Sequence, residues 1–374
     1  MVAKRMDGIK MSGIRKMFEK ASKDAIHLGL GEPDFPPPPE AIEALVQAAK
    51  DGNSKYSSIF GLEPLREEVA KYLRTYKPDI TKDDVLITVG GSEGLMCTAG
   101  SLYDPGDEVL MPDPGFVLYA PHARLMGAKP VFYSLTMDSD FQPQQDELLS
   151  LVTKKTKAII VNSPANPTGG VFGEKEVKMI VDLAKENDLV IITDEVYDHV
   201  IYEGKHISFL GKYDNVVYVN SFSKTFAMPG WRIGFLSAPK EIFERIATYH
   251  YYTLACAPNP NQLAVLAALK KGFYYAEKMT KEFKERRKII VDLLNDIPGF
   301  TANMPKGAFY SMPRYEKKVE DTAVAMKILE AGVVCTPGSA FGQHGKQHLR
   351  FSYASSKDNI KNGVAKVAEA WKKV

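Results

Sequence analysis

Residues 216–237, VVYVNSFSKTFAMPGWRIGFLS, contain an apolar run at each end and a polar segment between them. Both runs are short and typical of strands that are buried on two faces. Ser221, Ser223 and Lys224 directly follow the first run, and Arg232 lies just before the second. Because ligands of open α/β sheets bind beyond the carboxyl ends of the strands, this stretch predicts a sheet with a binding site at its edge.

The same alternation of apolar runs and helical stretches covers the middle of the chain. Runs of this kind, separated by helices, indicate a parallel or mixed sheet between layers of helices. The expected strands are residues 85–89, 108–111, 157–162, 189–193, 216–220 and 233–237. The expected helices between them include residues 92–103 and 174–186.

The N-terminal part of the chain has a different pattern. Residues 1–23 are expected to form a short helix or arm, and the four prolines 36–39 indicate an extended crossing segment. A helix is then expected from Glu40, with Gly52 at its C′ position. Its apolar face would hold Ile42, Leu45, Val46 and Ala49.

The last hundred residues favour a smaller α+β domain. A long helix is expected near residues 270–295, followed by a hairpin-like stretch at 307–312 and a helix at 322–331. Two short strands and a final helix complete this part. The apolar face of the final helix would hold Ile360, Val364, Val367 and Trp371.

The composition is that of an ordinary globular protein. With 374 residues, 45% of them hydrophobic and 25% charged, the chain can form two domains or one large α/β unit with an appendage. Its 48 Lys and Arg against 46 Asp and Glu provide no basic field for nucleic acid. No apolar stretch approaches the length of a membrane span, and the N-terminus lacks the apolar region of a signal peptide, so we expect a cytoplasmic protein.

The cysteines and histidines do not indicate a metal site. Cys97, Cys256 and Cys335 are odd in number, far apart and form no CxxC pair, so they suggest neither a disulfide framework nor a zinc site. His344 and His348 are four residues apart, but the glycines around them favour a solvated loop and no third ligand is evident. We therefore expect no metal.

Several polar residues at the ends of expected strands could bind a phosphate. Gly91 and Ser92 open the helix after residues 85–89, and backbone N–H groups at a helix N-terminus favour an anion. Ser221, Ser223 and Arg232 add two hydroxyl groups and a fork-shaped cation. These residues should gather in space although they are far apart in the sequence.

Three further residues suggest which phosphate compound is bound. Lys224 is the candidate nucleophile, and a lysine in such a site forms Schiff bases. Asp194 follows the expected strand 189–193 and could hold a ring nitrogen protonated, while Phe116 could stack on a ring. Pyridoxal 5′-phosphate (PLP) is the cofactor that needs a phosphate site, a protonated ring nitrogen and a lysine together.

The sequence also resembles a known family. Residues 221–234, SFSKTFAMPGWRIG, are similar to the Schiff-base segment of the class I aminotransferases, which belong to fold type I of the PLP enzymes. The resemblance runs in the family's order from about residue 10 to the C-terminus. Five further segments carry it: residues 31–35, Tyr56 with residues 61–66, residues 162–169, residues 193–197 and residues 349–354.

This resemblance implies a fold and a division of the chain. The fold is α/β, like that of aspartate aminotransferase, with a mostly parallel seven-stranded sheet between helices in a large PLP-binding domain. A smaller α+β domain is formed from both chain ends. The expected boundaries are an N-terminal arm with part of the small domain at 1–40, the large domain at 41–279 and the small C-terminal domain at 280–374.

It also implies a role for each candidate residue. Lys224 would hold PLP as a Schiff base and then move a proton, and Asp194 would pair with the ring nitrogen. Arg350 would grip the substrate carboxylate, helped by Asn166 and Gly31. The remaining cofactor contacts would be the ring contacts of Tyr197, Asn166 and Phe116, and the phosphate contacts of Gly91, Ser92, Glu93, Ser221, Ser223 and Arg232.

Tyr56 is expected to reach the phosphate of a second subunit. The resemblance therefore implies a homodimer with shared active sites. The implied reaction is a ping-pong transfer of the amino group from an L-amino acid to a 2-oxo acid, with 2-oxoglutarate as the expected acceptor.

The identity of the amino acid stays open between aspartate and an aromatic residue, with alanine or a broad range behind them. Some aspartate-preferring relatives carry a lysine where this chain has Ser92. Two other functional classes remain alternatives. One is a PLP-dependent C–S lyase or synthase of the same fold, and the other is a PLP-binding regulator, although the chain has no basic module for DNA.

Overall fold

The structure is a computed structural model that describes residues 3–9, 21–22 and 24–374. Its centre is a seven-stranded sheet with the order β2-β8-β7-β6-β5-β3-β4. All neighbouring pairs are parallel except those of β8, which is antiparallel to β2 and β7. The strands are β2 (Leu86–Thr88), β3 (Glu108–Asp113), β4 (Lys129–Ser134), β5 (Thr156–Asn162), β6 (Val190–Asp194), β7 (Val216–Ser221) and β8 (Gly234–Ser237). The expected mostly parallel seven-stranded sheet is confirmed.

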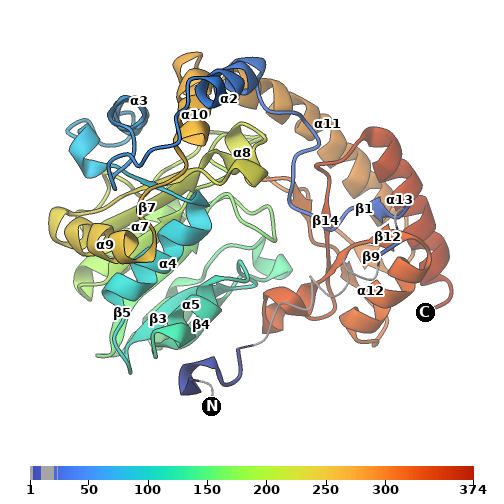
Figure 1. Ribbon diagram of the computed structural model, residues 1–374. Helices are drawn as coiled ribbons and strands as arrows, with labels where there is room; N and C mark the ends of the chain where they lie inside the picture. Colours follow the sequence, from blue (N-terminus) through green and yellow to red (C-terminus); the bar gives the residue numbers. More distant parts are fainter. Residues whose placement is uncertain (1–2, 10–20, 23) are drawn as a thin grey trace.

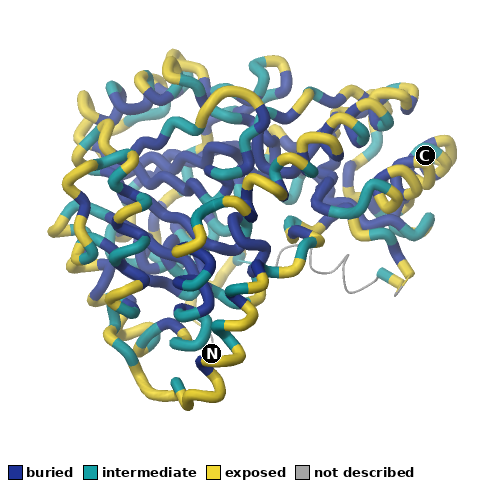
Figure 2. Tube along the Cα trace, turned by 90° about the horizontal axis from the view of Figure 1, so that it is seen from above, coloured by how far each residue is buried: buried dark blue, intermediate teal, exposed yellow. Residues whose placement is uncertain are grey.

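Helices cover both faces of this sheet because alternate residues of each strand point to opposite sides. In β7, Val217 and Val219 join one apolar cluster and Val216 joins another. The first cluster includes side chains of α4 (Gly90–Leu102), α5 (Tyr119–Leu125) and α9 (Lys240–Thr253). The second includes side chains of α6 (Gln145–Leu151) and α7 (Glu174–Glu186). Figure 2 shows the buried chain running through the middle of the larger part of the molecule.

Both ends of the chain build the smaller part, on the right in Figure 1. β1 (Ile26–His27) pairs in parallel with β12 (Val333–Val334), more than 300 residues further along the chain. Two more small sheets have the orders β10-β14-β13 and β11-β9. Their strands are β9 (Phe300–Thr301), β10 (Tyr310–Ser311), β11 (Arg314–Tyr315), β13 (Thr336–Pro337) and β14 (Leu349–Ser352). This arrangement resembles the expected small domain, while the boundaries at residues 40 and 280 stay a prediction.

The remaining helices complete the framework. Helix α13 buries Ile360, Val364, Val367 and Trp371, as the apolar spacing predicted. These helices are α2 (Pro39–Lys50), α3 (Glu63–Leu73), α8 (Phe222–Thr225), α10 (Asn259–Lys270), α11 (Tyr274–Asn295), α12 (Asp321–Glu330) and α13 (Lys357–Trp371). Short 3₁₀ turns are η1 (Lys4–Met6), η2 (Lys82–Asp84), η3 (Met137–Ser139), η4 (Pro229–Trp231), η5 (Gly338–Phe341) and η6 (Gln343–Gly345).

Helix α2 does not bury the face that its apolar spacing predicted. Ile42 and Val46 are 40% and 48% exposed, whereas Ala41 and Ala48 are buried. The helix packs against α10 through this face of small residues, and small side chains let two helices approach closely. Gly52 follows the helix with φ +70°, as its C′ position requires.

Three other expectations concern loops and charges. The stretch 307–312 forms no hairpin, because β10 pairs with β14, some 40 residues away. The charged run 281–288 is typical in sequence of an exposed helix face. This expectation is wrong for two of its residues: Arg286 and Arg287 are buried and pair with Asp34 and Glu203. Most of the expected N-terminal helix or arm lies outside the described residues.

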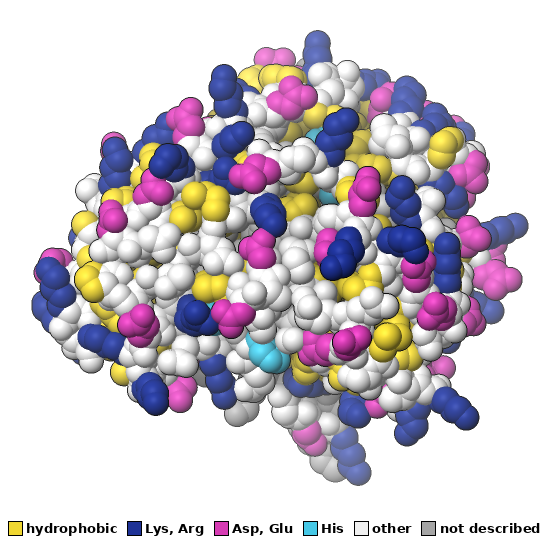
Figure 3. Space-filling model, turned by 180° about the vertical axis from the view of Figure 1, so that it is seen from behind, with side chains coloured by type: hydrophobic (Ala, Val, Ile, Leu, Met, Phe, Trp, Pro, Cys, Tyr) yellow, Lys and Arg dark blue, Asp and Glu magenta, His cyan; other side chains and the backbone are white. Residues whose placement is uncertain are grey.

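The surface agrees with the balanced net charge. Figure 3 shows positive and negative side chains interspersed over one face of the molecule, without a field of one sign. Within the part of the chain that the structure describes, no helix is both long and apolar enough to cross a membrane.

Candidate active site

A cavity of about 260 Å³ lies beyond the carboxyl ends of the central parallel strands. Its walls come from the central sheet, the small sheets and the segment after β1. Most of the expected site residues line it: Gly31, Gly91, Ser92, Phe116, Asn166, Asp194, Tyr197, Ser221, Ser223, Lys224, Arg232 and Arg350. The other lining residues are Leu95, Val117, Asn162, Val196, Pro229, Tyr310 and Phe341. The structure thus brings together residues that lie more than 300 positions apart in the sequence.

Lys224 is held at the centre of this cavity by the turn that follows β7. The turn is helix α8, and the side chain of Ser221 accepts a hydrogen bond from the Ser223 N–H at its start. The Nζ of Lys224 donates to the carbonyl oxygen of Gly31 at 2.6 Å. Burial lowers the pKa of Lys224 to about 8, so the neutral amine is far more populated near neutral pH than in an exposed lysine. A neutral amine is the nucleophilic form.

Asp194 ends strand β6 and is buried. Its Oδ2 accepts a hydrogen bond from the hydroxyl of Tyr119 at 2.8 Å. Burial raises the pKa of Asp194 to about 6, because a carboxylate loses its hydration in this position. A cationic partner would stabilise the carboxylate and offset its lost hydration, and a protonated ring nitrogen is such a partner.

Two residues join the middle of the cavity to the small sheets. Asn166 lies in the loop after β5, where its N–H donates to the Oδ1 of Asn162 at 2.8 Å. The hydroxyl groups of Tyr197 and Tyr310 are 2.7 Å apart. Burial raises the pKa of Tyr197 well above its usual value, so this phenol stays protonated and can donate a hydrogen bond to a ring oxygen. The ring of Phe116 lines the cavity and meets Tyr119 edge-on at 5.6 Å.

We call Gly91, Ser92, Ser221, Ser223 and Arg232 the phosphate side of the cavity. The first two open the 13-residue helix α4 after strand β2, and Ser221 ends the nearby strand β7. The guanidinium of Arg232 donates to the carbonyl oxygens of Pro229 and Val89 at 2.9 and 3.2 Å. Gly90 adopts φ +74°, a conformation that favours glycine, and a Cβ at this position would lie 2.3 Å from the Arg232 Nη2.

We call Gly31, Asn166 and Arg350 the carboxylate side. The Nη1 of Arg350 donates to the Asn166 Oδ1 at 2.8 Å, and its Nη2 donates to the carbonyl oxygen of Gly29 at 2.5 Å. The rings of Tyr310 and Phe341 each lie 4.6 Å from its guanidinium carbon. The Nε of Arg350 is buried without a partner among the described residues. A fixed, desolvated guanidinium of this kind suits a carboxylate.

Two expected site residues do not line the cavity. The side chain of Glu93 points away from it and bonds to Cys97 and His250, because Glu93 and Ser92 occupy different faces of helix α4. The side chain of Glu93 therefore does not face the cavity, and a contact between its backbone and the cofactor stays a prediction. Tyr56 is 85% exposed on the surface of this chain.

Three residues of the site were not singled out from the sequence. Tyr119 belongs to the same segment as Phe116, and its distance from Asp194 in the sequence hides their contact. Tyr310 and Phe341 clamp Arg350 from two separate segments. The contact between the buried Tyr119 and Asp194 is visible only in the folded structure.

The donor set fits PLP. The phosphate side offers a helix N-terminus, three serine hydroxyl groups and a guanidinium, which together suit a dianion. Asp194 suits the ring nitrogen, Tyr197 and Asn166 suit the ring oxygen, and Lys224 suits the aldehyde. A Cβ on Gly31 would lie 1.9 Å from the Tyr310 hydroxyl oxygen, so the backbone there approaches the cavity more closely than any other residue would allow.

Comparison with known proteins agrees with this fit. The model of the family "Aminotransferase class I and II" matches residues 23–367. A probable aspartate aminotransferase of Methanocaldococcus jannaschii is 40% identical over 99% of both chains. Aromatic-amino-acid aminotransferase 2 of Thermococcus litoralis is 37% identical over 98% of this chain and 97% of its own.

A solved structure gives the same result. Alanine aminotransferase from Pyrococcus furiosus superimposes with a TM-score of 0.94 at 33% identity, and the match covers 100% of both chains. The fold, the donor set and the sequence relatives point to one conclusion. The chain belongs to the class I and II aminotransferases and is a PLP-dependent enzyme of that family.

Proposed function

We propose that this aminotransferase moves the amino group of aspartate or an aromatic L-amino acid to 2-oxoglutarate by a ping-pong mechanism that uses a Schiff base at Lys224. The observation that carries the proposal is the presence of Lys224, Asp194 and Arg350 in one cavity. These residues offer an amine nucleophile, an anion for a ring nitrogen and a fork for a carboxylate. An amino-group transfer needs all three.

Each residue has a distinct task in this proposal. Arg350 binds the α-carboxylate that every amino acid carries, and so orients the Cα–H bond toward Lys224. The Lys224 amine takes the proton from Cα of the substrate and delivers it to C4′ of the cofactor. This transfer within the site replaces an exchange of the proton with solvent. When bound, PLP supplies the aldehyde that takes up the amino group and the ring that accepts electrons. Asp194 favours that ring in its cationic form.

The apolar lining of the cavity bears on the choice of amino acid. Phe341 lies against Arg350, and Leu95, Phe116 and Val117 also line the cavity, so an aromatic side chain would find apolar contacts there. Among the described lining residues, the cations are Lys224, Arg232 and Arg350. A second carboxylate, as in aspartate, would need a cation from outside this lining. Both donor classes remain in the proposal, since relatives with either name are similar to this chain.

The active form in this proposal is a homodimer. Tyr56 is 85% exposed and does not line the cavity of its own chain. In the dimer it would reach the phosphate side of the partner. If Tyr56→Ala and Lys224→Ala proteins are unfolded, mixed and refolded together, mixed dimers should recover activity above the sum of the two. Strictly additive activity would contradict the shared site.

An absorbance titration of PLP-loaded protein tests the reaction. Amino acids are added one at a time without an acceptor. The band of the aldehyde form should give way to that of the amine form, and 2-oxoglutarate should restore it. The ranking of amino acids would then identify the side-chain preference. Release of ammonia and pyruvate from cystathionine without an acceptor would favour a C–S lyase instead.

Lys224→Ala should lower turnover by about 10²–10⁴-fold or more, because it removes the intramolecular proton transfer together with the nucleophile. Single-turnover absorbance measurements would separate this loss from weaker PLP binding. Repeated turnover at a near wild-type rate would contradict the role of Lys224.

A further inference from the structure

His250 is buried in helix α9, outside the cavity, and both nitrogens of its ring face oxygen atoms. The Nδ1 lies 2.9 Å from the Glu93 Oε1, and the Nε2 lies 3.0 Å from the carbonyl oxygen of Ile59. A neutral ring could donate to only one of these acceptors. A ring that carries both protons satisfies both, and it then forms a buried ion pair with Glu93.

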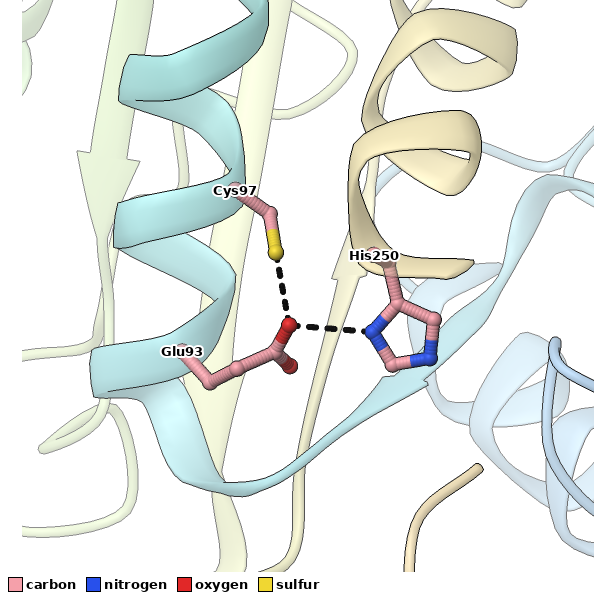
Figure 4. A group of neighbouring side chains, drawn as sticks. All are labelled: Glu93, Cys97 and His250. Atoms are coloured by element: carbon pink, nitrogen blue, oxygen red, sulfur yellow. Dashed lines mark hydrogen bonds and ion pairs between the residues drawn. The ribbon is translucent and has the colours of Figure 1, made fainter. Parts of the chain in front are cut away.

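Glu93 uses both of its carboxylate oxygens, and one of them meets both His250 and Cys97 (Figure 4). Its Oε1 also accepts from the Cys97 thiol at 2.6 Å, and its Oε2 accepts from the backbone N–H of Val89 at 3.1 Å. Burial acts to raise the pKa of Glu93, but the hydrogen bond and charge of His250 and the hydrogen bonds from Cys97 and Val89 together outweigh it, and the pKa is lowered. Glu93 is therefore a fixed anion that holds the residue before helix α4.

Val89 connects this anion to the cavity. Its N–H donates to Glu93, and its carbonyl oxygen accepts from the Arg232 Nη2 at 3.2 Å. Arg232 lines the phosphate side, and Gly91 and Ser92 follow Val89 by two and three residues. A continuous hydrogen-bonded path thus runs from His250 through Glu93 and Val89 to Arg232.

We propose that Glu93 and His250 are positioning residues for the phosphate side: their buried pair fixes the backbone of Val89 and thereby the guanidinium of Arg232 and the first turn of α4. The proposal rests on the proposed function, since the phosphate to be bound is that of PLP. Neither side chain touches the ligand. Their effect on it passes through hydrogen bonds and the placement of backbone groups.

The same pair reaches the segment that carries Tyr56. Ile59, whose carbonyl oxygen bonds to His250, lies three residues after Tyr56. Nearby, the Asn259 side chain donates to the carbonyl oxygen of Lys55 at 2.6 Å. His250 therefore holds the phosphate side and the base of this exposed segment at once.

The cluster also offers ligand atoms to a metal, with one atom each from Glu93, Cys97 and His250 within 4.8 Å of one another. Hydrogen bonds already account for all of these atoms, because one carboxylate oxygen accepts from both the thiol and the ring. Burial also raises the pKa of Cys97, which disfavours the thiolate that a metal requires. The hydrogen-bonded arrangement is thus the one that the geometry supports.

The test compares Glu93→Gln and His250→Gln with His206→Gln. His206 is a matched control, because its buried ring pairs with Glu195 at 2.5 Å and does not line the cavity. PLP-free protein is titrated with PLP, and inorganic phosphate is measured as a competitor of PLP. Melting temperature and the KM of the amino donor are recorded for each variant.

We expect Glu93→Gln and His250→Gln to weaken the binding of PLP and of inorganic phosphate by about tenfold. The KM of the amino donor should change by less than about twofold. His206→Gln should lower the melting temperature to a similar extent and leave phosphate affinity unchanged. Cys97→Ala keeps the ion pair between Glu93 and His250 and should also leave the phosphate affinity unchanged.

Equal phosphate affinity in Glu93→Gln and His206→Gln at matched stability would overturn the proposal. Stoichiometric Co²⁺ uptake with a thiolate absorption band that Cys97→Ala abolishes would overturn it in favour of a metal site. Failure of the proposed function is a separate result, because wild-type protein would then not convert amino acids at all.

Discussion

Arg232 and Arg350 line the same cavity, yet the chain positions them by different means. Arg232 belongs to the phosphate side, whose residues flank β2, β8 and β7, and these strands are neighbours in one sheet. Arg350 belongs to the carboxylate side, whose residues follow β1, follow β5 and lie in β14, which are in three different sheets. The phosphate side is thus built within one layer, whereas the carboxylate side exists only when both chain ends meet the large sheet.

This difference has a functional consequence. A cofactor stays bound through many turnovers, and a rigid single sheet suits it. A substrate must enter and leave. The parts that form the carboxylate side can move apart without either part unfolding. Substitutions on the two sides should therefore affect different measured quantities.

Among the substitutions that bear on this comparison, the largest expected effect lies between the two sides, at Asp194. Asp194→Asn should lower kcat by about 10³-fold, because the ring nitrogen loses its anionic partner. Rapid-kinetic measurement of each half-reaction would show the loss in both. An unchanged kcat would mean that Asp194 has no electrostatic role.

The same substitution should stabilise the PLP-free protein at neutral pH. Asp194 has a folded pKa of about 6 against an ordinary value of 3.8, so unfolding releases a proton between these pH values and stability falls as pH rises through them. Above pH 6 the buried charge costs about 2–3 kcal/mol, which asparagine avoids. Thermal unfolding at pH 7.5 and pH 4 should show a higher Tm for the variant only at the higher pH.

On the carboxylate side, Arg350→Lys should lower kcat/KM for every amino acid by about 10²-fold, because an ammonium cannot replace the bidentate fork. PLP affinity should stay within about twofold of wild type. Steady-state kinetics and a PLP titration on the same preparation would check both numbers. A matching loss of PLP affinity would show that the two sides are not independent.

The reciprocal change on the phosphate side should be smaller. Arg232→Lys should weaken PLP binding by about tenfold, since the serine hydroxyls and the N-terminus of α4 remain. The KM of the amino donor, measured at saturating PLP, should not change. A raised KM with normal PLP affinity would mean that Arg232 acts on the substrate and not on the phosphate of PLP.

The smallest expected effect is that of Tyr119→Phe. The Tyr119 hydroxyl donates to Asp194 and lowers the pKa of that carboxyl, so its removal should raise this pKa further. The acid limb of the pH–kcat profile should move to higher pH, with a loss of less than about tenfold at pH 7. A shift to lower pH would contradict the assigned direction of this hydrogen bond.

The sequence alone was sufficient for six of the seven strands of the central sheet, all but the edge strand β4, and for most of the phosphate side. Strand and helix periodicity there depends on neighbouring residues, and polar residues that follow parallel strands meet at one edge by geometry. Lys224, Asp194 and Ser221 are examples, because each lies at or just after the carboxyl end of its strand. The resemblance to aminotransferases added Arg350 and Asn166, which no local pattern links.

Tertiary structure decided the features that depend on the phase and approach of separate elements. Ser92 and Glu93 are adjacent in sequence, but the rotation of helix α4 directs one to the cavity and the other to His250. Helix α2 buries Ala41 and Ala48 rather than Ile42 and Val46, and it packs against α10. The aromatic clamp on Arg350 forms because β10, β14 and η5 converge on it, and side-chain packing of this range leaves no periodic signal in the sequence.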